Sequence, residues 1–85
     1  MARVVVVTKE GYDYSRTVSD WMEDFRRLTG RELEVLDPEK EEAFCQAYDL
    51  VEFPTILALD ERGAILSIWR GLPMPSKDEV LYYLV

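Results

Sequence analysis

Four consecutive valines near the N-terminus, Val4–Val7, constrain the fold of this 85-residue chain more than any other feature. An unbroken β-branched run is typical of a strand that is covered on both faces, and such strands lie in the middle of a sheet flanked by helices. A chain of this length has room for one hydrophobic core. We therefore expect one domain over residues 1–85, built around a central strand at 4–7.

Two helices and one strand are predicted in the first half of the chain. A helix over residues 14–29, ended by Gly30, is indicated by a single apolar stripe: Val18, Trp21, Met22, Phe25 and Leu28. A short strand over 32–36 follows. Asp37 and Pro38 then predict the start of a second helix, ending near Asp49, because Asp accepts first-turn N–H groups and proline fits the first helical position. Its predicted inward residues are Ala43, Phe44, Ala47, Tyr48 and Leu50.

The second half of the chain predicts a hairpin and a last helix. Strands over 53–59 and 64–70 are joined by a turn in which Gly63 takes a positive φ. After an irregular loop over 71–75, Ser76 and Glu79 form a capping box that starts the final helix. Because a βαβ unit has parallel strands and the hairpin extends the same sheet, the fold class is α/β. We expect a four-stranded mixed sheet, in the order 2-1-3-4, flanked by three helices.

Charge and composition exclude several function classes. A formal net charge of -7 disfavours binding to nucleic acid or to an anionic membrane. The chain has no histidine, and Cys45 is its single cysteine, so we expect no metal site, no cofactor and no internal disulfide. Cys45 fits a small, half-buried residue better than a reactive thiol. No signal-peptide pattern or membrane-length apolar run is visible, which favours a cytoplasmic protein.

Three local features sharpen the predicted topology. The stretch 8–16 connects the first strand to the first helix, Phe53-Pro54-Thr55 opens the third strand, and Trp69-Arg70-Gly71 ends the fourth. With the element order, they resemble the thioredoxin and glutaredoxin superfamily in its short form. The resemblance implies that Tyr12 and Ser15 stand where that family has its Cys-x-x-Cys pair. It also implies a cis proline at Pro54 that faces the active site.

The resemblance implies where an active site would lie, but the chain lacks the two cysteines that would act there. Disulfide exchange needs a thiolate and a second thiol that resolves the mixed disulfide, and neither Tyr12 nor Ser15 supplies one. The leading hypothesis is therefore a redox-inactive domain, monomeric or weakly dimeric, that binds a protein or peptide. In the family the corresponding groove lies beside the cis-Pro loop, and here it would be lined by Tyr12, Tyr14, Phe53, Pro54, Thr55, Gly71, Leu72 and Met74.

Two alternatives stay open from the sequence. The chain is also compatible with a member of a thiol-disulfide oxidoreductase family that has lost its catalytic cysteines, naturally or by mutation. It is compatible as well with a glutathione or small-ligand binder. Lys9 lies near the position of the lysine with which glutaredoxins grip glutathione, but the stretch 71–75 lacks the acid of their Gly-Gly-Asp turn. We expect Lys9 to be an ordinary solvated charge, and Trp21 and Trp69 to belong to the core.

Overall fold

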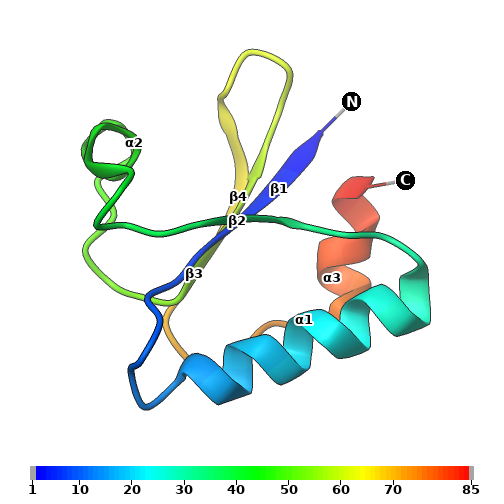
Figure 1. Ribbon diagram of the computed structural model, residues 1–85. Coiled ribbons are helices and arrows are strands. Elements are labelled where there is room, and N and C mark those ends of the chain that lie inside the picture. Colours follow the sequence, from blue (N-terminus) through cyan, green and yellow to red (C-terminus); the bar gives the residue numbers. More distant parts are fainter. Residues whose placement is uncertain (1, 85) are drawn as a thin grey trace.

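The computed structural model describes residues 2–84, which form a mixed sheet with helices on both faces (Figure 1). The sheet has four strands in the order β2-β1-β3-β4. They are β1 (Arg3–Val7), β2 (Glu34–Leu36), β3 (Thr55–Leu59) and β4 (Ile65–Arg70). The helices are α1 (Ser15–Thr29), α2 (Glu42–Ala47) and α3 (Lys77–Leu81), the last continued by a short 3-10 helix, Tyr82–Leu84. The predicted α/β class, sheet order and three helices are confirmed.

Strand β1 separates two apolar clusters. It pairs in parallel with β2 and antiparallel with β3, and β3 pairs antiparallel with β4. Val4 and Val6 face the cluster under α1 and α3, whereas Val5 and Val7 face the cluster under α2. Figure 1 shows α1 and α3 on one side of the sheet and α2 on the other. All four valines are buried, as expected for a strand covered on both faces.

Helix α1 buries a narrower stripe than predicted. Val18, Trp21 and Phe25 are buried, and Met22 lies partly buried against the same cluster. Leu28, by contrast, is 74% exposed, so its assignment to the core was wrong. At 3.6 residues per turn Leu28 lies about 60° from Phe25 around the helix, on the margin of the stripe. It also lies in the last turn, just before Gly30 ends the helix with φ 71°.

Helix α2 begins four residues after Pro38, the predicted first helical residue. The Asp37 carboxylate accepts the Glu39 N–H at 2.9 Å, and the Asp37 carbonyl accepts the N–H groups of Lys40 and Glu41 at 3.0 Å each. Asp37 therefore caps a separate turn, and the backbone leaves helical geometry at Glu41 before α2 starts at Glu42. The inward residues also differ from the prediction, because two of the five are exposed: Ala43 and Ala47.

The remaining boundaries shift by one or two residues. β2 begins at Glu34 rather than at residue 32, β3 at Thr55 rather than at 53, and β4 at Ile65 rather than at 64. Gly63 has φ 86° in the hairpin turn, as predicted. The Ser76 hydroxyl accepts the Glu79 N–H at 3.3 Å, so the predicted start of α3 is confirmed. In residues 2–84 no helix is both long and apolar enough to cross a membrane.

Replacing Phe25 with alanine is expected to cost about 3–5 kcal/mol of unfolding free energy, because the ring fills the core between α1 and the sheet. The matched change Leu28→Ala, three residues away on the same helix, is expected to cost less than about 0.5 kcal/mol. Urea denaturation followed by tryptophan fluorescence measures both. Equal losses for the two variants would contradict the placement of Leu28 outside the core.

Candidate functional site

The turn between β1 and α1 holds positions 12 and 15 against each other. The Ser15 hydroxyl accepts the Tyr12 N–H at 3.0 Å and donates to the Lys9 carbonyl at 2.9 Å. The Ser15 N–H also donates to the Tyr12 carbonyl at 2.9 Å. Gly11, at φ 79°, allows the chain to turn here. The Ser15 side chain is thus a structural clamp for the turn, with its proton committed to a backbone carbonyl.

Lys9 links this turn to the Pro54 loop. Its ammonium lies 5.1 Å from the centroid of the Tyr12 ring and 5.3 Å from that of Phe53. Such distances give cation–π attraction. The Lys9 N–H also donates to the Tyr14 hydroxyl at 3.2 Å, and the Tyr14 ring stacks on Tyr12 at 5.8 Å. Lys9 is half-buried, and its two ring contacts were not part of the expectation of an ordinary solvated charge.

The Pro54 loop is fixed to the end of β4. The Phe53–Pro54 peptide bond is cis, and the Pro54 carbonyl accepts the Gly71 N–H at 2.8 Å. The Thr55 side chain is fully buried and donates to the Glu52 carbonyl at 2.5 Å. Gly71 has φ 69°, and a Cβ there would lie 3.3 Å from a Glu52 carboxylate oxygen. Pro54, Thr55 and Gly71 therefore hold the loop in place through internal hydrogen bonds and close packing.

The expected groove residues divide into exposed and inward-facing groups. Tyr12 is 50% exposed and Leu72 is 52% exposed, and Phe53 is half-buried. Tyr14 and Met74 lie partly buried against the cluster under α1 and α3. The structure gathers Tyr12, Tyr14 and Phe53 around Lys9. Leu72 and Met74 follow Gly71 at the other side of the Pro54 loop.

A hollow of about 290 Å³, which was not predicted from the sequence, adjoins Phe53 on the α2 side of the sheet. Its lining includes Lys9, Phe53 and Cys45, with Pro38, Glu39, Glu42 and Gln46. Burial raises the pKa of the Cys45 thiol, and the carboxylates of Glu41 and Glu42 raise it further. Cys45 is therefore a protonated, apolar part of the wall. Five of the lining residues come from the stretch 38–46, whereas Lys9 and Phe53 come from two other segments, so no single local motif marks the hollow.

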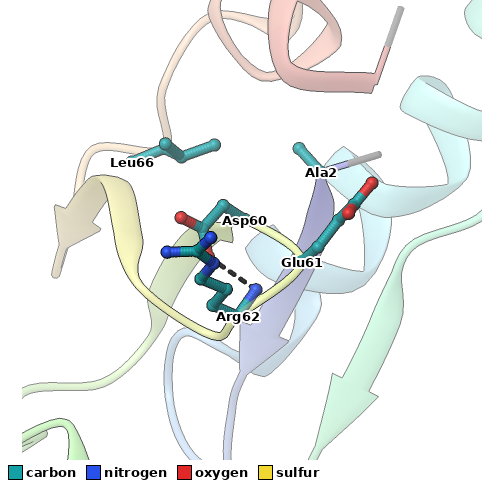
Figure 2. Close-up of a pocket in the computed structure, with 5 residues that line it drawn as sticks. All are labelled: Ala2, Asp60, Glu61, Arg62 and Leu66. Atoms are coloured by element: carbon teal, nitrogen blue, oxygen red, sulfur yellow. Dashed lines mark hydrogen bonds between the residues drawn. The ribbon is translucent and has the colours of Figure 1, made fainter.

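A second hollow, of about 370 Å³, lies at the tip of the β3–β4 hairpin (Figure 2). The Asp60 carboxylate in it accepts the N–H groups of Arg62 and Ala64 at 2.8 and 2.9 Å, so this acid serves to close the turn. Asp60 and Pro54 flank opposite ends of β3. The hairpin hollow is thus separate from the Pro54 loop. No group of three or more possible metal ligands occurs within the described chain.

Solved structures with the same architecture include thioredoxins. A Schistosoma mansoni thioredoxin pre-protein superposes with a TM-score of 0.73 at 17% identity, covering 95% of this chain and 73% of the other. A malaria-parasite thioredoxin-2 gives 0.72 at 15% identity over 99% and 81% of the two chains. Thioredoxin 1 of Thermosipho africanus gives 0.67 at 12% identity over 96% and 89%. The chain has a thioredoxin-like fold. Neither a protein-family model nor a curated protein sequence matches it.

In this thioredoxin-like domain, the first turn into α1 and the Pro54 loop lie beside each other. Lys9 contacts an aromatic ring from each segment. The Pro54 carbonyl in turn binds the residue that follows β4. The arrangement presents aromatic side chains and one ammonium at the surface.

Removing the Ser15 hydroxyl is expected to lower the unfolding free energy by about 1 kcal/mol, because Ser15→Ala loses the bonds to Tyr12 and Lys9 that hold the turn. Ser19→Ala, one turn later on an exposed position of α1, is the matched control and should change it by less than about 0.5 kcal/mol. Chemical denaturation measures both. If the two variants were equally stable, Ser15 would not be a clamp.

Proposed function

We propose that this thioredoxin-like domain is redox-inactive and binds a protein or peptide segment in the groove beside the Pro54 loop. The observation that carries the proposal is the position of the Lys9 ammonium over the rings of both Tyr12 and Phe53. This contact makes one continuous surface of the turn and the loop. Aromatic side chains of this kind are enriched at protein interfaces.

Redox inactivity follows from the groups at positions 12 and 15. A phenol cannot form a disulfide, and the Ser15 hydroxyl already donates to the Lys9 carbonyl. The chain has no histidine that could activate a hydroxyl as a base. Cys45 is buried, and its raised pKa keeps it from being a thiolate near neutral pH. No group here meets the requirements of dithiol exchange, and a reducing cytoplasm would keep Cys45 a thiol.

The backbone of Phe53 supplies a second means of binding. Its N–H and C=O take part in no hydrogen bond with any described residue, whereas the neighbouring Pro54 carbonyl is bonded to Gly71. An extended peptide can pair with such free backbone groups, and side-chain contacts then provide selectivity. The Phe53 and Tyr12 rings lie where those contacts would form. The hollow beside Phe53 could accept one small apolar side chain of the bound segment.

Glutathione binding is the weaker alternative. Lys9 lies close to the Pro54 loop, but its ammonium is engaged by two rings. The stretch 71–75, Gly-Leu-Pro-Met-Pro, contains no carboxylate for the amine of the tripeptide. The aromatic surface therefore fits a peptide side chain better than it fits a charged tripeptide.

Peptides selected on the native chain from a display library test the groove. Phe53→Ala and Tyr12→Ala are each expected to weaken the selected peptide about tenfold, because buried aromatic contacts dominate such interfaces. Leu28→Ala removes an exposed apolar side chain from the last turn of α1 and is the matched control, with native affinity expected. Fluorescence anisotropy of the labelled peptide gives the dissociation constants. Native affinity in both groove variants would reject the groove as the binding site.

A further inference from the structure

Strand β4 forms one edge of the sheet and directs unpaired backbone groups outward. Gly71 and Pro54 are a hydrogen-bonded pair that continues the β3–β4 register of Arg70 with Thr55. Because bonded and non-bonded pairs alternate between antiparallel strands, the N–H and C=O groups of Ile68 and Arg70 point away from β3. These are four donors and acceptors at the open edge. A further strand could pair with all of them.

The two edges of the sheet differ in how they are protected. At the other edge, β2 has three residues, and Glu34 forms a two-point ion pair with Arg3 at 2.9 and 2.7 Å. Strand β4 has six residues, contains neither lysine nor proline, and exposes Ile65 and Leu66. Charged residues, prolines and short length are the usual defences of an edge against pairing. On β4 two protective features occur: a bulge next to Leu59, at the far end from Ile68, and the charged side chain of Arg70, which donates to the Asp49 carbonyl at 3.5 Å.

An aromatic groove runs beside this edge on the α3 side of the sheet. The hollow measures about 410 Å³ and is lined by Ser67, Trp69, Asp78, Glu79, Tyr82 and Tyr83. The Trp69 and Tyr83 rings meet edge to face at 5.8 Å, and Tyr82, 72% exposed, meets Tyr83 at 5.1 Å. Alternate side chains of a strand added to β4 would point to this side and enter the groove.

Charge in the groove selects the kind of strand. The carboxylates of Asp78 and Glu79 line it, and no ion pair within residues 2–84 involves either one. Among the described residues, the Glu79 carboxylate accepts hydrogen bonds only from the neutral groups of Trp69 and Ser76. A lysine or arginine would find both a carboxylate and the Tyr82 ring here. A second copy of this chain would bring the same acids and a net charge of -7 against them.

We propose that the open edge of β4 and the adjoining groove bind an extended basic segment of another protein, which adds a fifth strand to the sheet. Ile68 and Arg70 supply the main-chain hydrogen bonds. Lysine or arginine side chains at alternate positions of the added strand lie over Tyr82 and pair with Asp78 and Glu79. This surface is separate from the Pro54 groove, because its aromatic residues come from β4, α3 and the 3-10 helix that follows.

The direct test uses a blocked seven-residue peptide of alternating lysine and valine, titrated into the ¹⁵N-labelled chain. Shifts are expected at the amides of Ile68, Arg70 and Tyr82, together with at least tenfold slower hydrogen exchange at Ile68 and Arg70. A peptide with glutamate in place of lysine, and a lysine peptide with an N-methylated backbone, are each expected to bind at least tenfold more weakly. Equal affinity of the lysine and glutamate peptides, or no shift at Ile68 and Arg70 at millimolar peptide, would overturn the proposal.

Variants separate this site from the Pro54 groove. Asp78→Asn with Glu79→Gln is expected to weaken the lysine peptide about fivefold, with the effect lost at high salt. Glu23→Gln, an exposed acid on α1, is the matched control and should bind like the native chain. Tyr12→Ala should also leave this binding unchanged. If Tyr12→Ala weakened the binding and the Asp78 and Glu79 variant did not, the peptide would be assigned to the Pro54 groove instead.

Discussion

Strand β1 is covered on both faces and paired on both edges, and the placement of the other elements depends on it. Its four valines are shared between the two apolar clusters, so each helix layer packs against the same five-residue strand. The antiparallel pairing of Val7 with Thr55 has a direct consequence for the surface. The chain leaves β1 and enters β3 at the same end of the sheet, so the segments after Val7 and before Thr55 must meet there.

The binding surface that we propose is made by that meeting. Lys9 lies two residues after β1 and Phe53 two residues before β3, and the ammonium of the first contacts the ring of the second. Tyr12 completes the contact from the turn that Ser15 holds closed. At this point of the surface, aromatic rings surround the Lys9 ammonium. The second surface that we propose, at the outer edge of the same sheet, carries the carboxylates of Asp78 and Glu79 instead.

Local patterns in the sequence predicted those parts of the fold that depend on neighbours along the chain. The valine run, Gly30 and Ser76 predicted β1, the end of α1 and the start of α3, because each acts on backbone within a few residues. Leu28 was misplaced because the apolar stripe alone does not show that its last residue, at the margin of the stripe and in the last turn of α1, faces solvent. Asp37 does cap a turn, as predicted, but this turn is separate from α2. For the site, the positions of Tyr12 and Phe53 were predicted, whereas the contact with Lys9 depends on strand register and was not.

We propose that Tyr12 and Ser15 occupy the positions of a cysteine pair on a thioredoxin-like scaffold. Their backbones are already linked at 2.9 Å, and the Ser15 hydroxyl reaches the Tyr12 N–H at 3.0 Å. The most direct measurement is insulin reduction by the double variant Tyr12→Cys with Ser15→Cys. We expect the native chain to be inactive, and the variant to form a 12–15 disulfide and reduce insulin. A folded variant whose two thiols neither pair nor react would contradict this account.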